Sequence, residues 1–220
     1  MSYGGILQTM FKKLSFGLAT CALSMASLAS ATVLTPGSAG APDPFSNAGW
    51  TLLATTGSQA LSSGTFTANA TSWVYSDSAN TFCAGCLDFV FMVTRTGGND
   101  PIERITAGSF AGYLVDAGVV TSSPGFAPSS VNLSSDGIVV GFNYQTANLT
   151  GTQSTQLLVI QTNATAFTTG LLSVQDQLSA NGVGFQPAAA TPEPVSMSLL
   201  GGGLALIGLG RWRRNKNKKS

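Results

Sequence analysis

Two cysteines have the spacing in this sequence that is most typical of chemistry. Cys83 and Cys86 form a C-x-x-C pair, which can be a redox centre, half of a zinc site, a haem attachment site or a disulfide. Haem attachment needs a histidine after the second cysteine, but Leu87 stands there and the chain contains no histidine. A zinc site needs two more Cys or His ligands, and the only other cysteine is Cys21 in the apolar N-terminal segment. We therefore expect neither a metal nor a cofactor.

The absence of histidine also removes the usual hydrolase mechanisms. Ser-His-Asp and Cys-His sites need an imidazole to relay the proton of the nucleophile. A glycosidase needs only two carboxylates, but the candidates are scattered along this sequence. Asp88, on a predicted strand, could bind a cation or a sugar, or simply be hydrogen-bonded or solvated. Asp77, Asp100 and Asp136 lie in turn-like stretches that their short side chains stabilise. We predict no catalytic residue and expect a protein that is not an enzyme.

Charge is distributed unevenly along the chain. The whole protein carries a formal net charge of +1, but most Lys and Arg residues lie in its two ends. Between residues 32 and 190 the only basic residues are Arg95 and Arg104, against eight Asp and Glu residues. A surface that binds nucleic acid needs clustered Lys and Arg to release phosphate counterions. The acidic, Ser- and Thr-rich middle therefore excludes nucleic acid as a partner.

The middle of the chain has the pattern of an all-β domain over residues 48–185. In the clearest run, residues 87–94, the odd-numbered residues from Leu87 share one apolar face and the even-numbered ones from Asp88 share the other. Residues 138–144 repeat this alternation. Further strands are expected at residues 50–54, 64–68, 72–75, 102–106, 113–115, 155–162 and 170–174. Short strands joined by Gly-rich turns predict an antiparallel β-sandwich or jelly roll. The Pro-, Ala- and Gly-rich residues 32–47 and 186–190 are expected to be a flexible segment and a linker.

The first 31 residues have the three parts of a secretory signal peptide. A basic region ends at Lys12-Lys13, an apolar region covers residues 14–28, and Ala29-Ser30-Ala31 follows. Since signal peptidase accepts only small side chains before the cut, we expect a signal helix that engages the secretion translocon and cleavage after Ala31. An exported domain meets an oxidising compartment, so Cys83 and Cys86 are expected to form a disulfide. The redox alternative needs a thioredoxin-like βαβ setting, whereas this pair opens a strand.

The C-terminus, residues 191–220, has a second three-part pattern. Pro192-Glu193-Pro194 is followed by an uncharged stretch over residues 195–210 and then by a basic end over residues 211–220. At 1.5 Å per residue the uncharged stretch is about 24 Å long, which predicts a short transmembrane helix. The basic residues, which predict a cytoplasmic C-terminus, are Arg211, Arg213, Arg214, Lys216, Lys218 and Lys219.

This order of motif, span and basic end resembles the PEP-CTERM sorting domain of bacteria that make exopolysaccharide. The resemblance covers about the last 30 residues. It implies that an exosortase, a membrane protease-transpeptidase, recognises Pro192, Glu193 and Pro194 and removes the span, so that contact with the membrane through residues 195–210 is transient. Residues 83–94 also resemble a stretch found in PEP-CTERM proteins of unknown activity, and this second resemblance implies no catalytic residue.

These observations lead to one expected function and two alternatives. The expectation is an exported, non-enzymatic protein of the cell surface or extracellular matrix that is sorted through its tail and associates with exopolysaccharide. One alternative is a carbohydrate-active enzyme that uses paired carboxylates. The other is a membrane-tethered adhesin whose tail is never cleaved.

Overall fold

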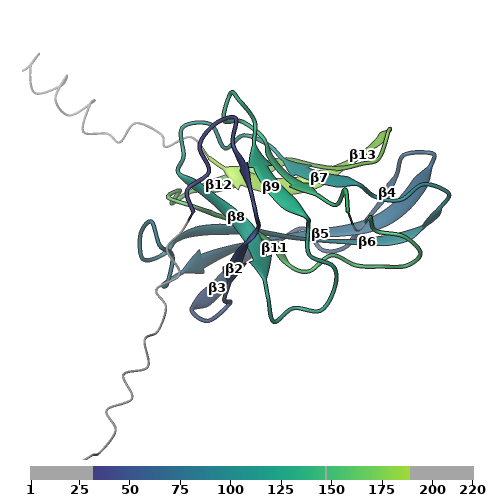
Figure 1. Ribbon diagram of the computed structural model, residues 1–220. Coiled ribbons are helices and arrows are strands. Elements are labelled where there is room, and N and C mark those ends of the chain that lie inside the picture. The colour runs from purple at the N-terminus through teal and green to yellow at the C-terminus, as the bar shows by residue number, and fades with distance from the viewer. Residues whose placement is uncertain (1–31, 147, 189–220) are drawn as a thin grey trace, which may run out of the picture.

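Two β-sheets packed face to face make up the regular structure of residues 32–146 and 148–188, which the computed structural model describes (Figure 1). The first sheet has six strands in the order β1-β9-β10-β7-β12-β13, and all of its pairings are antiparallel. Its strands are β1 (Ala39–Gly40), β9 (Ser130–Leu133), β10 (Val140–Asn143), β7 (Arg104–Ala107), β12 (Phe167–Gln175) and β13 (Ser179–Pro187). This arrangement confirms the predicted all-β, sandwich-like fold.

The second sheet has seven strands and carries the candidate site. Its order is β2-β8-β11-β6-β5-β3, with β4 also pairing with β5, and only the β2–β8 pairing is parallel. Its strands are β2 (Asp43–Phe45), β8 (Val115–Val120), β11 (Leu158–Thr162), β6 (Cys86–Gly98), β5 (Phe66–Asp77), β3 (Trp50–Thr55) and β4 (Gln59–Ser62). The long strands β5 and β6 form its centre because their β-branched and aromatic residues favour extended backbone.

The core lies between the two sheets and is built from alternate residues of most strands. On β6 the odd-numbered residues from Leu87 to Val93 belong to it, as the alternation predicts. Phe89 packs edge-on against Phe110, with ring centroids 5.6 Å apart. The predicted run over residues 138–144 is correct for Val140, Phe142 and Tyr144, which are fully buried, whereas Ile138 precedes β10 and is 41% exposed.

The outer face of the seven-stranded sheet is covered in part, which the alternation does not predict. Val90 on β6, Val120 and Val159 form a second buried cluster on that face. Phe45, Trp50, Trp73, Tyr75 and Leu157 pack against these valines. A strand with both faces buried loses the polar alternation that marks a solvated face. Both faces at the start of β6 are therefore buried among apolar side chains, and Asp88 is enclosed on the outer face.

The N-terminal segment, expected to be flexible over residues 32–47, takes part in both sheets. β1 pairs with β9, and β2 pairs with β8. The Leu34 side chain is buried in the core, and its amide donates to the Val115 carbonyl at 2.8 Å. These pairings form because two strand edges, at β8 and β9, offer unpaired backbone groups that the Pro- and Gly-rich segment can satisfy. The other end also differs, because β13 extends into the predicted linker as far as Pro187.

The predicted signal helix and transmembrane helix lie outside the described residues. Within residues 32–146 and 148–188 there is no helix long and apolar enough to cross a bilayer.

Candidate functional site

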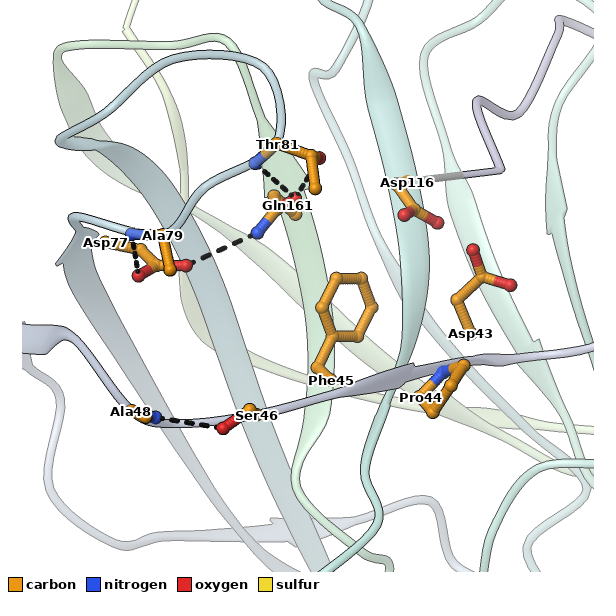
Figure 2. Close-up of a pocket in the computed structure, with 10 residues that line it drawn as sticks. All are labelled: Asp43, Pro44, Phe45, Ser46, Ala48, Asp77, Ala79, Thr81, Asp116 and Gln161. Carbon is orange, nitrogen blue, oxygen red and sulfur yellow. Dashed lines mark hydrogen bonds between the residues drawn. The ribbon is translucent and has the colours of Figure 1, made fainter. Parts of the chain in front are cut away.

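A pocket of about 430 Å³ opens at one end of the outer face of the seven-stranded sheet. Strands that are far apart in the sequence supply its polar groups: Asp43 on β2, Asp77 on β5, Asp116 on β8 and Gln161 on β11. Figure 2 shows the ring of Phe45 standing between the Asp77–Gln161 pair and the Asp43–Asp116 pair. The pocket thus combines carboxylates, an amide and one aromatic face.

Strand register aligns Asp116 and Gln161 with two further polar side chains, Asp88 and Tyr75. Gln161 on β11 is opposite Asp116 on β8 and also opposite Asp88 on β6, and Asp88 is in turn opposite Tyr75 on β5. Directly opposed side chains lie about 4.5 to 5.5 Å apart at Cβ. Four neighbouring strands therefore place one polar row across the outer face, at the end where β6 begins.

The loop between β5 and β6 folds over this row and satisfies part of it. The Asn80 side-chain amide donates to Asp88 Oδ1 at 3.0 Å and to the Thr162 carbonyl at 3.1 Å. Thr81 donates to Gln161 Oε1 from both its amide, at 3.1 Å, and its hydroxyl. Gln161 donates in turn to Asp77 Oδ2 at 3.4 Å. Asp88 is fully buried under this loop, so it does not present an open surface to a sugar or a cation.

Only one of the two carboxyl oxygens of Asp88 has a hydrogen-bond partner among the described residues. Its Oδ2 is buried and has no hydrogen-bond partner among the described residues, and the same holds for the nearby Trp50 Nε1. Burial, followed by the charge of Asp77, raises the pKa of Asp88 to about 8. A protonated carboxyl is the form that such an enclosed position favours.

Asp43 and Asp116 form a second carboxylate pair, and Figure 2 shows their oxygens pointing toward each other. Asp116 is 2% exposed, and its Oδ1 is buried with no hydrogen-bond partner in the described part of the chain. Burial, followed by the charge of Asp43, raises the pKa of Asp116 to about 7. Asp43 Oδ2 accepts a hydrogen bond from the Thr32 amide at 2.9 Å. The pocket therefore contains two carboxyl groups that face each other, and one of them has a buried oxygen without a hydrogen-bond partner among the described residues.

The predicted disulfide is present. Cys83 and Cys86 are bonded with Cα atoms 5.4 Å apart, and Gly85 between them adopts a positive φ of 82° that lets the chain turn sharply. The Cys86 amide also donates to the Cys83 carbonyl at 3.0 Å. The disulfide closes the C-terminal end of the loop that carries Asn80 and Thr81, so its position is next to the candidate site.

Of the acidic residues in the predicted turns, Asp136 stabilises its turn, whereas Asp77 both stabilises a turn and lines the pocket. Asp136 accepts hydrogen bonds from the Ser134 hydroxyl and from the Ile138 amide, and these bonds hold the pKa of its carboxyl below the usual range. Asp77 accepts from the Ala79 amide at 2.8 Å, which is a turn contact, but its other oxygen faces the pocket. Sequence reasoning did not single out Asp43, Asp116 or Gln161. Their one signal is a polar side chain inside an apolar run, as in Val115-Asp116-Ala117.

The sorting motif, the basic cluster and the signal cleavage residues lie outside the described residues. They are Pro192, Glu193, Pro194, Arg211, Arg213, Arg214, Lys216, Lys218, Lys219, Ala29 and Ala31. Their assigned roles stay predictions. In residues 32–146 and 148–188, no three His, Cys, Asp or Glu residues are grouped as metal ligands would be.

No family model, curated protein or solved structure matches this chain. The residues of the chain and the geometry of the pocket are therefore what indicate its function.

Proposed function

We propose that this chain is an exported bacterial protein of the cell surface or matrix, processed at both ends, whose β-sandwich is a non-catalytic component associated with exopolysaccharide. The observation that carries the proposal is the order of Pro192-Glu193-Pro194, apolar segment and basic end at the C-terminus, opposite an N-terminal signal. The Cys83–Cys86 disulfide supports it, because disulfides persist in oxidising compartments outside the cytoplasm.

The processing proposal predicts the mass of the mature protein. In cells that contain the sorting protease, the exported species starts at Thr32 and lacks the span at residues 195–210. In cells without the protease, a membrane-anchored precursor with a cytoplasmic C-terminus accumulates and keeps residues 195–220. Intact-mass measurement of both species tests this. A wild-type species that still contains residues 195–220 would instead identify a tethered adhesin.

The association with exopolysaccharide is supported by the chemistry of the pocket. Carboxylate and amide oxygens accept hydrogen bonds from sugar hydroxyls, and the Phe45 ring offers an apolar face to a sugar ring. Sedimentation of the mature protein with exopolysaccharide purified from the producing cells tests this role. We expect Phe45→Ala and Asp77→Asn to reduce the bound fraction, whereas Leu171→Ala, an exposed residue on the other sheet, leaves it unchanged. Equal binding by all four proteins would remove the pocket from the proposal.

One observation favours the enzyme alternative, namely the facing carboxylates of Asp43 and Asp116. A glycosidase uses two carboxyl groups, one of them a general acid with a raised pKa, and the pKa of Asp116 is raised to about 7. Release of reducing ends from the same exopolysaccharide would measure such an activity. Loss of that release in Asp116→Asn would favour the enzyme, and absence of release from the wild-type protein would favour the non-catalytic role.

A further inference from the structure

We propose that removal of the signal peptide creates the group that completes the Asp43–Asp116 site: the α-ammonium of Thr32, which binds between the two carboxylates. This inference rests on the proposed export of the chain and on cleavage after Ala31. It assigns Asp43 and Asp116 to recognition of the mature N-terminus of the protein itself.

The position of the Thr32 nitrogen is the first argument. It lies 2.9 Å from Asp43 Oδ2, to which its amide donates a hydrogen bond. It also lies close enough to Asp116 that its amide, with that of Ala117, opposes the rise in the Asp116 pKa. The atom that signal peptidase would release is thus already at the carboxylate pair, and no rearrangement is needed to bring it there.

The residues after Thr32 hold it in this place. The Leu34 amide donates to the Val115 carbonyl, which belongs to the residue before Asp116, and the Leu34 side chain is 7% exposed in the core. Gly37 donates to the Leu133 carbonyl at 3.0 Å. An N-terminus that begins two residues before a buried anchor has little freedom to leave the site.

The second argument is charge. Three carboxylates, those of Asp43, Asp77 and Asp116, line the pocket, and Asp88 lies beyond Gln161. The two arginines of the described residues are bound elsewhere. Arg95 donates to the backbone carbonyls of Gly98, Asp100 and Gly151, and Arg104 donates to Asn143 in the other sheet. In the described part of the chain no basic side chain is therefore available to neutralise Asp43 and Asp116.

Cleavage supplies what is missing. Hydrolysis adds one water across the Ala31–Thr32 bond, so that the Ala31 carbonyl becomes a carboxylate and the Thr32 nitrogen becomes an amine, which takes up a proton at neutral pH. One neutral N–H becomes a cation with three N–H donors. The unpartnered Asp116 Oδ1 gains a donor, and an opposite charge within a few ångströms returns the Asp116 pKa toward its ordinary range while raising that of the amine.

The sequence makes the test clean, because the chain has no lysine between residues 32 and 215. After processing at both ends the α-amine is the only amine in the protein, and acetic anhydride acylates an amine only in its unprotonated form. The mature protein is isolated from producing cells, its N-terminus is identified by mass, and its rate of acylation is measured against pH. We expect the amine to react about tenfold more slowly near pH 7 than that of a Thr-initiated peptide, since one pKa unit is a tenfold change in free amine. Asp43→Asn and Asp116→Asn restore the faster rate, and Asp100→Asn, in the loop after β6, does not.

Unfolding by urea gives an independent measurement, because we expect Asp116→Asn to change the urea midpoint in opposite directions before and after acetylation of the amine. In the mature protein near pH 7.5 we expect Asp116→Asn to lower the urea midpoint, because it removes the partner of the ammonium. After acetylation of the amine the same substitution raises the midpoint, because it removes repulsion from Asp43.

The possible failures are distinguishable. A mature protein that starts at Thr32 but has an amine of ordinary reactivity, unchanged by Asp43→Asn and Asp116→Asn, overturns this inference and leaves the proposed export intact. A mature N-terminus at another residue, or a chain that stays in the cell with its signal, overturns the inference together with its premise. If the tail is retained, Lys216, Lys218 and Lys219 are acylated too, and peptide masses assign each modification.

Discussion

Replacing Asp88 with Asn tests whether the enclosed carboxyl group on β6 carries a proton at neutral pH. Its pKa is raised from 3.8 to about 8 by burial and by Asp77. Between these two values the folded state binds a proton that the unfolded state has lost, so the free energy of unfolding falls as the pH rises from about 4 to about 8. Asn resembles the protonated acid in shape and does not titrate. The substitution should therefore remove this loss of stability.

The size of the effect follows from the shift. About four pKa units at 1.36 kcal/mol each set an upper limit of about 5 to 6 kcal/mol. Part of the shift comes from the charge of Asp77, which the substitution leaves in place, so we expect roughly 2 to 3 kcal/mol to be recovered by Asp88→Asn at alkaline pH. In acid the variant and the wild type should be equally stable, because both then present a neutral group to Asn80.

Urea unfolding followed by the fluorescence of Trp50 and Trp73 measures this at about pH 4.5 and about pH 8.5. Asp88→Asn should exceed the wild type at the higher pH and show the flatter dependence. Asp100→Asn, which removes a carboxylate from the loop after β6, should keep the wild-type slope. If Asp88→Asn is less stable than the wild type at both pH values, the carboxylate is ionised and its charge is needed, and the reasoning fails.

Three further changes test other parts of the fold, the first two by the urea midpoint and the third by limited proteolysis. Arg95 is 5% exposed and donates to the carbonyls of Gly98, Asp100 and Gly151. Arg95→Met should therefore lower the free energy of unfolding by about 3 kcal/mol, and Arg95→Lys should lower it less. An unchanged midpoint would show that water replaces the guanidinium. Cys83→Ser with Cys86→Ser should cost about 1 to 2 kcal/mol, as expected for a four-residue loop, and the oxidised wild type alone should lose this amount on reduction. A Cβ at Gly118 would overlap the backbone of Asp43, so Gly118→Ala should displace β2 and speed proteolysis of the N-terminal segment, whereas Gly40→Ala, which has open space, should not.

The sequence predicts the strands that have one apolar face and misses features that depend on pairing. Leu87 to Val93 alternate as the core requires, and the same alternation identifies Val140 and Phe142. β8 is buried over its whole length, so neither of its faces is solvated, and the strand predicted at residues 113–115 ends at Val115, where β8 begins. A strand buried on both sides has no polar face to reveal its period.

The candidate site follows from register, which the sequence does not encode in a readable form. Asp88 is notable in the sequence because its strand is clear, but its partners Asn80 and Gln161 come from a loop and from a separate strand. Asp43 lies in a segment whose Pro and Gly residues predict flexibility, and only its pairing beside Gly118 brings it to Asp116. The disulfide can be predicted without the strand register, because both cysteines lie within one turn.

The placement of β1 and β2 has a consequence for the order in which the protein folds. These strands are made first, yet their partners β9 and β8 are made only after all of β3 to β7 has been synthesised. Because closing such a long loop is slow, we expect β1 and β2 to pair after the middle of the sandwich has formed. Leu34 and Asp43 can then dock only after β8 and its neighbouring strands have formed. The beginning of the chain is thereby one of the last parts to reach its native position.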